Sequence, residues 1–542
     1  MSRLRAVSSI IKRRKESLLD EIYQPKETYL GTEIEPVHTG LPKTTRSLCP
    51  ECKRIIPARE FEEDGKVMME KTCPQHGYFK DIVYSDVDFY FRMEDWFFGD
   101  GNGLINPSIT DATTCPQDCG LCNLHTSHTA LGNIDLTNRC NLRCPICFAN
   151  ANAAGYLYEP SYKQIVQMLQ NFRDMKPVPA ACVQFSGGEP TVHPRFLDVV
   201  QSAKSMGFSA VQIATNGIKF ADLDFATQAR EAGVHSLYLQ FDGTSDDIYK
   251  KTRGRPLLEI KLAVIENCRQ TGMKVVFVPT IAKGVNEHEV GNILRLAIEN
   301  VDVVSGVSYQ PIAFTGRFSE EERESMRFTL PDLAHCIEEQ VGFVKANDWV
   351  PLTCSSPLSR MLGSINGKEM TTYTCHPHCS AATYLFVDDK GNATQLTDFV
   401  DFKGLLEEID VLARRTGMSR MKVLSKLRFA NVLRKHFNAR KAPEGLTFMK
   451  FIRTLYELTG KKYDRDESKI GQNTYRTMMI GGMHFMDAYN YDVQRVQRCV
   501  VHYAAPNGRI YPFCAYNSGP VYREQVEREF SVPYKKAVNN SD

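Results

Sequence analysis

The sequence predicts an α/β chain built on a partial, TIM-like (β/α)6 barrel, with an N-terminal metal knuckle and a C-terminal extension rich in cysteine and helix. Between about residues 133 and 312, apolar strand-like runs alternate with helical patterns. Closely spaced cysteines precede that region, and a basic helical stretch with further cysteines follows it. These three observations together favour a central barrel with two metal-binding extensions.

Length and charge set the outer bounds of the interpretation. The 542 residues exceed the roughly 250 to 300 at which one core stops growing, so several domains are expected. A formal charge of +2 argues against nucleic acid as a partner of the whole chain. The sequence has no run of about 18 apolar residues and no secretory leader, which predicts a cytoplasmic protein. Peripheral binding at the inner face of the membrane is the alternative.

We divide the chain into four parts. These are a basic N-terminal segment (1–45), a cysteine-rich knuckle region (46–132), the barrel (133–330) and a C-terminal region (331–542) with a basic helical insertion (402–480). Residues 1–22 have the pattern of a basic amphipathic helix, for which a solvated helix is the simpler interpretation.

The knuckle region contains a self-contained ligand set. Cys49, Cys52, Cys73 and His76 form C-x2-C and C-x2-H pairs, separated by an alternating stretch with an Asp64-Gly65 turn. This spacing fits a single tetrahedral ion, either zinc or a rubredoxin-like iron.

The barrel region alternates strand and helix six times. Strands are expected at 133–137, 181–186, 210–215, 236–242, 274–280 and 304–312, with helices near 161–175, 194–206, 224–232, 257–271 and 288–299. An open doubly wound sheet would show the same alternation. The barrel is preferred because the candidate motifs follow strands, at the face where barrel chemistry takes place.

The stretch from 411 to 461 is strongly basic. It contains 13 Lys and Arg residues against 2 Asp and Glu, among Leu, Phe, Met and Val. Such a stretch can bind anionic lipid headgroups. A solvated pair of helices or an RNA-binding face is the alternative.

The most specific motif directly follows the first barrel strand. Cys140, Cys144 and Cys147 form C-x3-C-x2-C, followed by Phe148. Three thiolates on one loop can hold three irons of a [4Fe-4S] cluster and leave the fourth iron free for a ligand. A structural zinc site would need two paired sets of ligands, so we prefer the cluster.

Eight further thiols are enough for two auxiliary [4Fe-4S] clusters. We expect Cys115, Cys119 and Cys122 to share one cluster, completed by a distant thiol of the C-terminal group. That group consists of Cys354, Cys375, Cys379, Cys499 and Cys514. Zinc ligation, or packing without a metal, is the alternative. Cys182, Cys268 and Cys336 stand alone in apolar surroundings and are interpreted as packing residues.

The cysteine triad with its aromatic residue resembles the radical S-adenosylmethionine (SAM) superfamily. This resemblance implies that SAM binds the open iron and yields a 5'-deoxyadenosyl radical, with electrons from a low-potential ferredoxin or flavodoxin. It also implies that further positions line the SAM and substrate pocket. These are Phe148, Gly187, Gly188, Glu189, Asn216, Gln240, Asp242, Thr280 and Gln310.

The order of the cysteine motifs from about 46 to 535 is similar to that of archaeal tetraether lipid synthases. The same group carries a second assignment, the methylation of 7,8-dihydro-6-hydroxymethylpterin. The first implies coupling of the terminal methyl carbons of two isoprenoid ether lipids at a membrane surface. Such methyl groups need a radical, because no side chain can deprotonate them. Methylation of the pterin is the alternative function. A peptide-modifying enzyme and a non-catalytic electron carrier are weaker hypotheses.

Overall fold

The structure is a computed structural model that describes residues 36–96, 98, 104–147, 149, 151–152, 155–314, 320–417, 422–459 and 475–533. The helix expected at 1–22 lies outside these residues, as do Phe148 and parts of the 402–480 insertion.

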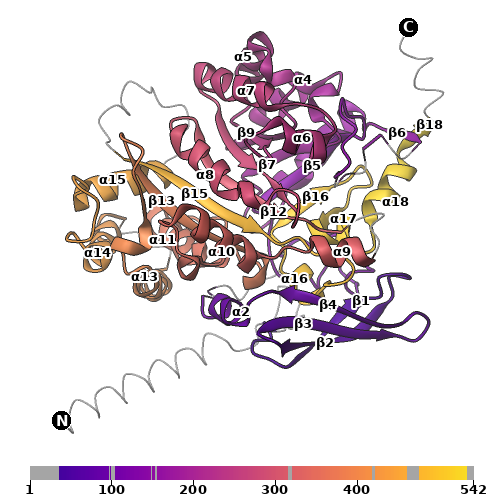
Figure 1. Ribbon diagram of the computed structural model, residues 1–542, viewed down its shortest axis with the longest axis horizontal. Coiled ribbons are helices and arrows are strands. Elements are labelled where there is room, and N and C mark those ends of the chain that lie inside the picture. Colours follow the sequence, from indigo (N-terminus) through magenta and orange to yellow (C-terminus); the bar gives the residue numbers. More distant parts are fainter. Residues whose placement is uncertain are drawn as a thin grey trace.

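A four-stranded antiparallel sheet forms the knuckle region and lies at the lower edge of Figure 1. Its strands are β1 (Lys43–Leu48), β2 (Ile55–Glu63), β3 (Lys66–Cys73) and β4 (Gly77–Tyr84), and α2 (Val87–Glu94) follows. Asp64 and Gly65 both have positive φ, 51° and 72°, which is the geometry of the tight hairpin expected between β2 and β3. Asp86 begins α2, because its side chain accepts the Phe89 N–H at 2.9 Å.

All six expected barrel strands are present, and they pair in parallel in chain order. They are β5 (Leu131–Thr137), β7 (Cys182–Gly187), β8 (Ala210–Thr215), β9 (Ser236–Gln240), β10 (Lys274–Val278) and β12 (Val304–Pro311), with the short β11 (Thr280–Ile281) beside β12. Because the strands are parallel, all their carboxyl ends lie on one face, where the expected motifs converge.

The C-terminal extension adds strands to both edges of this sheet (Figure 1). At one edge β15 (Tyr475–Met483) pairs in parallel with β12, followed by the antiparallel β13 (Ser380–Asp388) and β14 (Ala393–Gln395). At the other edge β16 (Val501–Ala504) pairs in parallel with β5, followed by the antiparallel β17 (Ile510–Pro512). The result is a mixed sheet that does not close into a barrel.

The expected barrel helices are also present. They are α3 (Tyr162–Arg173), α4 (Phe196–Ser205), α5 (Leu223–Ala232), α7 (Leu258–Thr271) and α8 (Val290–Glu299), with an additional α6 (Asp246–Arg253). Ser161 and Gln164 form a capping box that begins α3. The helices bury one face against the sheet in one large apolar core.

The remaining elements belong to the C-terminal half. Helices there are α9 (Glu320–Met326), α10 (Leu330–Val341), α11 (Ser356–Asn366), α12 (Leu396–Phe399), α13 (Phe402–Thr416), α14 (Lys422–His436), α15 (Phe448–Thr459), α16 (Val493–Gln497), α17 (Phe513–Asn517) and α18 (Tyr522–Glu529). A small sheet joins β18 (Ser531–Pro533) to β6 (Tyr156–Tyr158). Helices α11, α13, α14 and α15 share a separate apolar core. None of the described helices is long and apolar enough to cross a membrane.

Candidate radical site and metal centres

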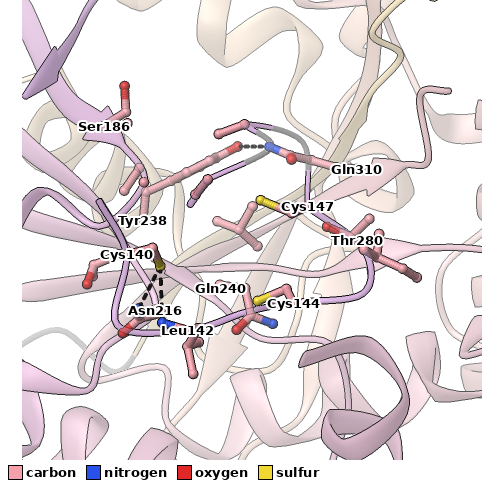
Figure 2. Close-up of a pocket in the computed structure, with 18 of the residues that line it drawn as sticks. Cys140, Leu142, Cys144, Cys147, Ser186, Asn216, Tyr238, Gln240, Thr280 and Gln310 are labelled. Carbon is pink, nitrogen blue, oxygen red and sulfur yellow. Dashed lines mark hydrogen bonds between the residues drawn. The ribbon is translucent and has the colours of Figure 1, made fainter. Parts of the chain in front are cut away.

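The loop after β5 carries the three cysteines of the radical motif. Cys140, Cys144 and Cys147 are all partly exposed, and they border the same cavity (Figure 2). Burial raises the pKa of the Cys140 thiol to about 12, and Glu189 and the two neighbouring thiols add to the rise. Three thiolates therefore need a cationic group to remain charged side by side, and a [4Fe-4S] cluster meets that need.

Two glycines at the end of β7 allow the cysteine loop to pack directly against that strand. A Cβ at Gly188 would lie 2.2 Å from the carbonyl oxygen of Arg139. Gly187 has φ of +122°, and a Cβ there would lie 2.3 Å from the carbonyl oxygen of Thr137. Only glycine fits both positions, so the backbone after Ser186 forms one wall of the cavity.

The cavity lies at the carboxyl ends of the parallel strands and has a volume of about 270 Å³. It brings together most of the residues expected from the sequence. Those that line it are Cys140, Cys144, Cys147, Gly187, Gly188, Asn216, Gln240, Thr280 and Gln310.

Glu189 does not line the cavity but lies directly behind it. One carboxylate oxygen accepts the backbone N–H of Thr191 at 3.2 Å and the hydroxyl of Thr215 at 2.9 Å. The other oxygen accepts the backbone N–H of Asn216 at 2.8 Å. Asn216 in turn approaches the Sγ atom of Cys140 at 3.9 Å. Glu189 therefore positions Asn216, a residue of the cavity wall.

Asp242 is likewise withdrawn from the cavity. It is fully buried and forms a two-pronged ion pair with Arg253, with N···O distances of 2.5 and 3.0 Å. Arg253 also donates to the carbonyl oxygen of Ile146 at 2.8 Å, within the cysteine loop. The pair therefore ties the end of β9 to the loop.

Several residues of the site were not expected from the sequence. The hydroxyl of Tyr238 lines the cavity, bonds Ser308 at 2.7 Å and accepts a hydrogen bond from Gln310 at 3.1 Å (Figure 2). Lys261 is fully buried behind the cavity and donates to the Asn216 carbonyl oxygen at 2.5 Å and to Gln240 at 2.9 Å. Tyrosine and lysine within ordinary strand and helix patterns give no separate signal in the sequence.

The C-terminal extension supplies another part of the cavity wall. Phe485, Tyr503, Phe513 and Arg523 line the cavity, and the rings of Phe485 and Phe513 stack with centroids 4.0 Å apart. Arg523 forms a buried ion pair with Asp135 of β5. This pair joins the extension to the first barrel strand.

The knuckle ligands converge as expected. The ligand atoms of Cys49, Cys52, Cys73 and His76 lie within 4.8 Å of one another, which suits a single tetrahedral ion. They come from the turns that follow β1 and β3, so the sheet itself fixes their positions. In the described part of the chain, no other group of three or more such side chains meets this distance.

The remaining eight thiols lie in two neighbourhoods. Cys115, Cys119 and Cys122 are buried together; burial raises the pKa of Cys115 and of Cys119, and the charge of Cys122 would add to both rises. In the second neighbourhood, burial raises the pKa of Cys375, and Cys379, Cys499 and Cys354 add to the rise. Cys514 relates to both sets, since Cys379 raises its pKa while its side chain packs in the same apolar cluster as Cys115 and Cys119.

Some buried polar groups near these thiols lack hydrogen-bond partners. Arg495 is 3% exposed, and its Nε and Nη1 atoms have no hydrogen-bond partner among the described residues. Burial opposes its charge, yet Cys379 and Cys514 raise its pKa. The hydroxyl of Tyr491 also has no partner in the described chain, and it is close to Cys115 and Cys514. A cation facing thiolates suits an anionic iron–sulfur cluster.

Comparison with known proteins agrees with this arrangement. Residues 134–297 match the radical SAM superfamily, and residues 41–85 match the HMPTM N-terminal zinc ribbon domain. A GTP 3',8-cyclase of Lactiplantibacillus plantarum is 28% identical over 183 residues, 33% of this chain and 54% of that protein. The crystal structure of Streptococcus suis SuiB bound to precursor peptide SuiA covers 54% of this chain and 69% of its own, with 14% identity and a TM-score of 0.32.

One relative matches almost the whole chain. The protein named 7,8-dihydro-6-hydroxymethylpterin dimethyltransferase of Methanocaldococcus jannaschii is 44% identical over 500 residues, 91% of this chain and 96% of that protein. The match thus extends well beyond the radical SAM region at residues 134–297. The chain therefore belongs to the radical SAM superfamily and, within it, to the family of this dimethyltransferase.

Proposed function

We propose that this chain is a radical SAM methyltransferase whose substrate is a reduced pterin such as 7,8-dihydro-6-hydroxymethylpterin. The observation that carries the proposal is the 44% identity to the pterin dimethyltransferase along 91% of the chain. The comparisons thus favour the methyltransferase over the coupling of lipid chains, which the order of the cysteine motifs had suggested first.

The chemistry of the cavity supports a flat, polar substrate. Gln184 is 8% exposed and lines the cavity, and its Oε1 atom has no partner within the described chain. Its Nε2 atom donates to Asn133 at 2.9 Å. A buried acceptor without a partner costs about 1–3 kcal/mol, so the site favours a ligand that brings an N–H or O–H group. An alkyl chain brings none.

Aromatic residues provide the complementary surface. The Phe485 and Phe513 rings and Tyr503 pack together and form an aromatic part of the cavity wall. Such a wall suits a fused heteroaromatic ring, which presents an apolar face and a polar edge. We infer that the pterin ring lies against this wall with its polar edge toward Gln184.

The cysteine loop defines where reaction occurs. A [4Fe-4S] cluster held by Cys140, Cys144 and Cys147, with bound SAM, supplies a 5'-deoxyadenosyl radical. Asn216, Gln240 and Thr280 line the space beside these thiols and orient what binds there. Residues of the barrel strands and of the C-terminal extension both line this space.

The insertion gives a specific reason to retain lipid coupling as a second candidate. Leu427 on α14 and Met449 on α15 are 64% and 72% exposed, within the basic stretch. Exposed apolar side chains among lysines and arginines can bind an anionic bilayer. The membrane surface would then deliver isoprenoid ether lipids to the enzyme.

A single pair of assays separates the two functions. Anaerobically reconstituted enzyme receives SAM, a strong reductant and 7,8-dihydro-6-hydroxymethylpterin, and products are measured by mass spectrometry. We expect pterin products heavier by one or two CH2 units, absent with the Cys140→Ala variant. In parallel, lipids are extracted from a tetraether-free host that expresses the chain. Production of 5'-deoxyadenosine without any methylated pterin, together with paired lipid chains, would overturn the pterin proposal.

A further inference from the structure

Lys261 is a fully buried lysine whose contacts are neutral. It lies in the first turn of α7, and its ammonium group donates to the Asn216 carbonyl oxygen at 2.5 Å and to the Oε1 atom of Gln240 at 2.9 Å. Within the described part of the chain, Lys261 forms no ion pair. A buried charge without a contacting opposite charge is costly, so packing alone would favour an apolar side chain here. The position therefore calls for a role other than stabilising the core.

The two acceptors of Lys261 belong to the wall of the radical cavity. Asn216 follows β8, Gln240 ends β9, and both line the cavity together with the cysteine thiols (Figure 2). A lysine ammonium group has donors and no acceptor, so it can bond only the oxygen of the Gln240 amide. If the amide turned over, its N–H2 group would face the ammonium group. Lys261 thus determines which end of the amide is held.

The end of the amide that is not held is a hydrogen-bond donor. The Nε2 atom of Gln240 is buried and has no hydrogen-bond partner among the described residues. Burial opposes the charge of nearby Asp242, whose pKa is lowered mainly by Arg253 and to a smaller extent by Gln240. The carboxylate of Asp242 is nonetheless bonded to Arg253 and to the Thr280 N–H, at 2.5 to 3.1 Å. The Gln240 N–H2 group therefore suits a ligand that brings an acceptor.

Gln184 shows the opposite arrangement at the same cavity. Its Nε2 atom donates to Asn133 at 2.9 Å, which leaves its Oε1 atom without a partner in the described chain. Gln184 therefore offers an acceptor, whereas Gln240 offers a donor. The partner of Gln184 is itself an amide, which can turn over, but the partner of Gln240 can only donate. The polarity at Gln240 is accordingly the more strictly fixed of the two.

We propose that Lys261 is a positioning residue for SAM, which holds the Gln240 amide so that its N–H2 group donates to an acceptor oxygen of bound SAM. SAM offers such oxygens in its carboxylate and its ribose hydroxyl groups. Lys261 does not line the cavity, so it acts only through its neighbour. This inference rests on membership of the radical SAM superfamily and is independent of the substrate that is methylated or coupled.

Substitution of the buried lysine tests this role. Lys261→Met removes the donor at nearly constant size, and Lys261→Gln keeps a group that can accept as well as donate. Lys71→Met is the matched control. Lys71 of β3 is also buried and also has neutral acceptors, Ser47 Oγ at 2.9 Å and the Ala488 carbonyl oxygen at 2.7 Å, but it does not contact a residue of the cavity wall.

SAM binding to the unreduced, anaerobically reconstituted enzymes is measured by calorimetry, together with iron content and melting temperature. At equal iron content, we expect both Lys261 variants to bind SAM about three- to tenfold more weakly than the parent, as the loss of one oriented hydrogen bond implies. The Lys71→Met variant should bind SAM like the parent. A lower melting temperature with unchanged SAM affinity in the Lys261 variants would show a structural role only and would overturn the proposal.

A double-mutant cycle tests whether Lys261 acts through Gln240. Gln240→Met alone should weaken SAM binding at least as much as Lys261→Met, and the combination of the two should cost no further affinity. If Lys261→Met does not fold, Lys261→Gln combined with Gln240→Met gives the same comparison. Losses of affinity that add in the double variant would contradict the proposal, because Lys261 would then act by another route.

Discussion

Replacing Glu189 by Gln tests how the buried carboxylate positions the SAM pocket. Both of its oxygens accept a backbone N–H, from Thr191 at 3.2 Å and from Asn216 at 2.8 Å. An N–H group can only donate, so an amide of the same shape must lose one of these two bonds. The bond to Asn216 is the one expected to fail, because the other oxygen also accepts two hydroxyl groups.

The expected cost follows from this geometry. A hydrogen bond to a charged group contributes about 1.5–3 kcal/mol, and no cavity forms because the side chains have the same size. We take about 2 kcal/mol, which corresponds to a roughly 30-fold change in an equilibrium constant. Since Asn216 lies in the cavity wall, we expect Glu189→Gln to weaken SAM binding by up to that factor.

Calorimetry of SAM binding to the anaerobically reconstituted enzyme measures this loss, with iron content determined for each sample. Glu289→Gln is the matched control. Glu289 is 7% exposed and also accepts a backbone N–H, from Thr244 at 2.7 Å, but neither residue lines the cavity. The control should lower the melting temperature without weakening SAM binding. Equal loss of affinity in both variants, or none in Glu189→Gln, would refute the assigned role.

Three further outcomes are expected. Cys73→Ser should remove one equivalent of zinc or iron, measured by elemental analysis, and expose residues 41–85 to proteolysis. Burial opposes the charge of Asp242, but Arg253 holds its pKa below the ordinary 3.8. The resulting stability is complete above about pH 4 and is lost as pH falls through the lowered pKa, so the melting temperature of the parent should fall more steeply in acid than that of Asp242→Asn. Arg495→Gln removes a positive charge that faces Cys379 and should lower the midpoint potential of an auxiliary cluster signal in a redox titration followed by electron paramagnetic resonance. An unchanged midpoint potential would show that the charge of Arg495 does not act on such a cluster.

The barrel strands could be predicted because each follows a local pattern. Apolar runs such as 210–215 end at turn residues, and helices such as α3 begin at a capping box. The knuckle ligands also follow from spacing alone, since two short-range pairs joined by a hairpin must converge. Local signals thus fix the elements and the sites that lie within them.

Contacts between distant segments could not be predicted in this way. The pairing of β15 with β12 and of β16 with β5 joins residues far apart in the sequence. The alternation of apolar and polar side chains along a strand does not identify the strand with which it pairs. For the same reason, the sequence did not identify Arg523 as a residue of the site, because its ion-pair partner Asp135 is 388 residues away. It also explains why Glu189 and Asp242, which follow strands as ligand residues do, prove to lie one layer behind the cavity.

The register of β16 beside β5 determines how the thiol groups relate to the cavity. Val501 pairs with Leu131 at the start of β5, whereas Cys140 follows the end of that strand. Six residues of strand span about 20 Å, so Cys499 and the radical cysteines lie toward opposite ends of β5.

Phe513 lines the cavity, and the next residue, Cys514, belongs to the auxiliary thiols. The cavity wall at Phe513 is therefore adjacent in the chain to Cys514, one of the thiols expected to hold an auxiliary cluster. Because β16 is bonded to β5 and Arg523 is paired with Asp135, a shift of that wall would also move the strand that leads into Cys140. The C-terminal extension accordingly shares the sheet of the barrel strands and lines the same cavity.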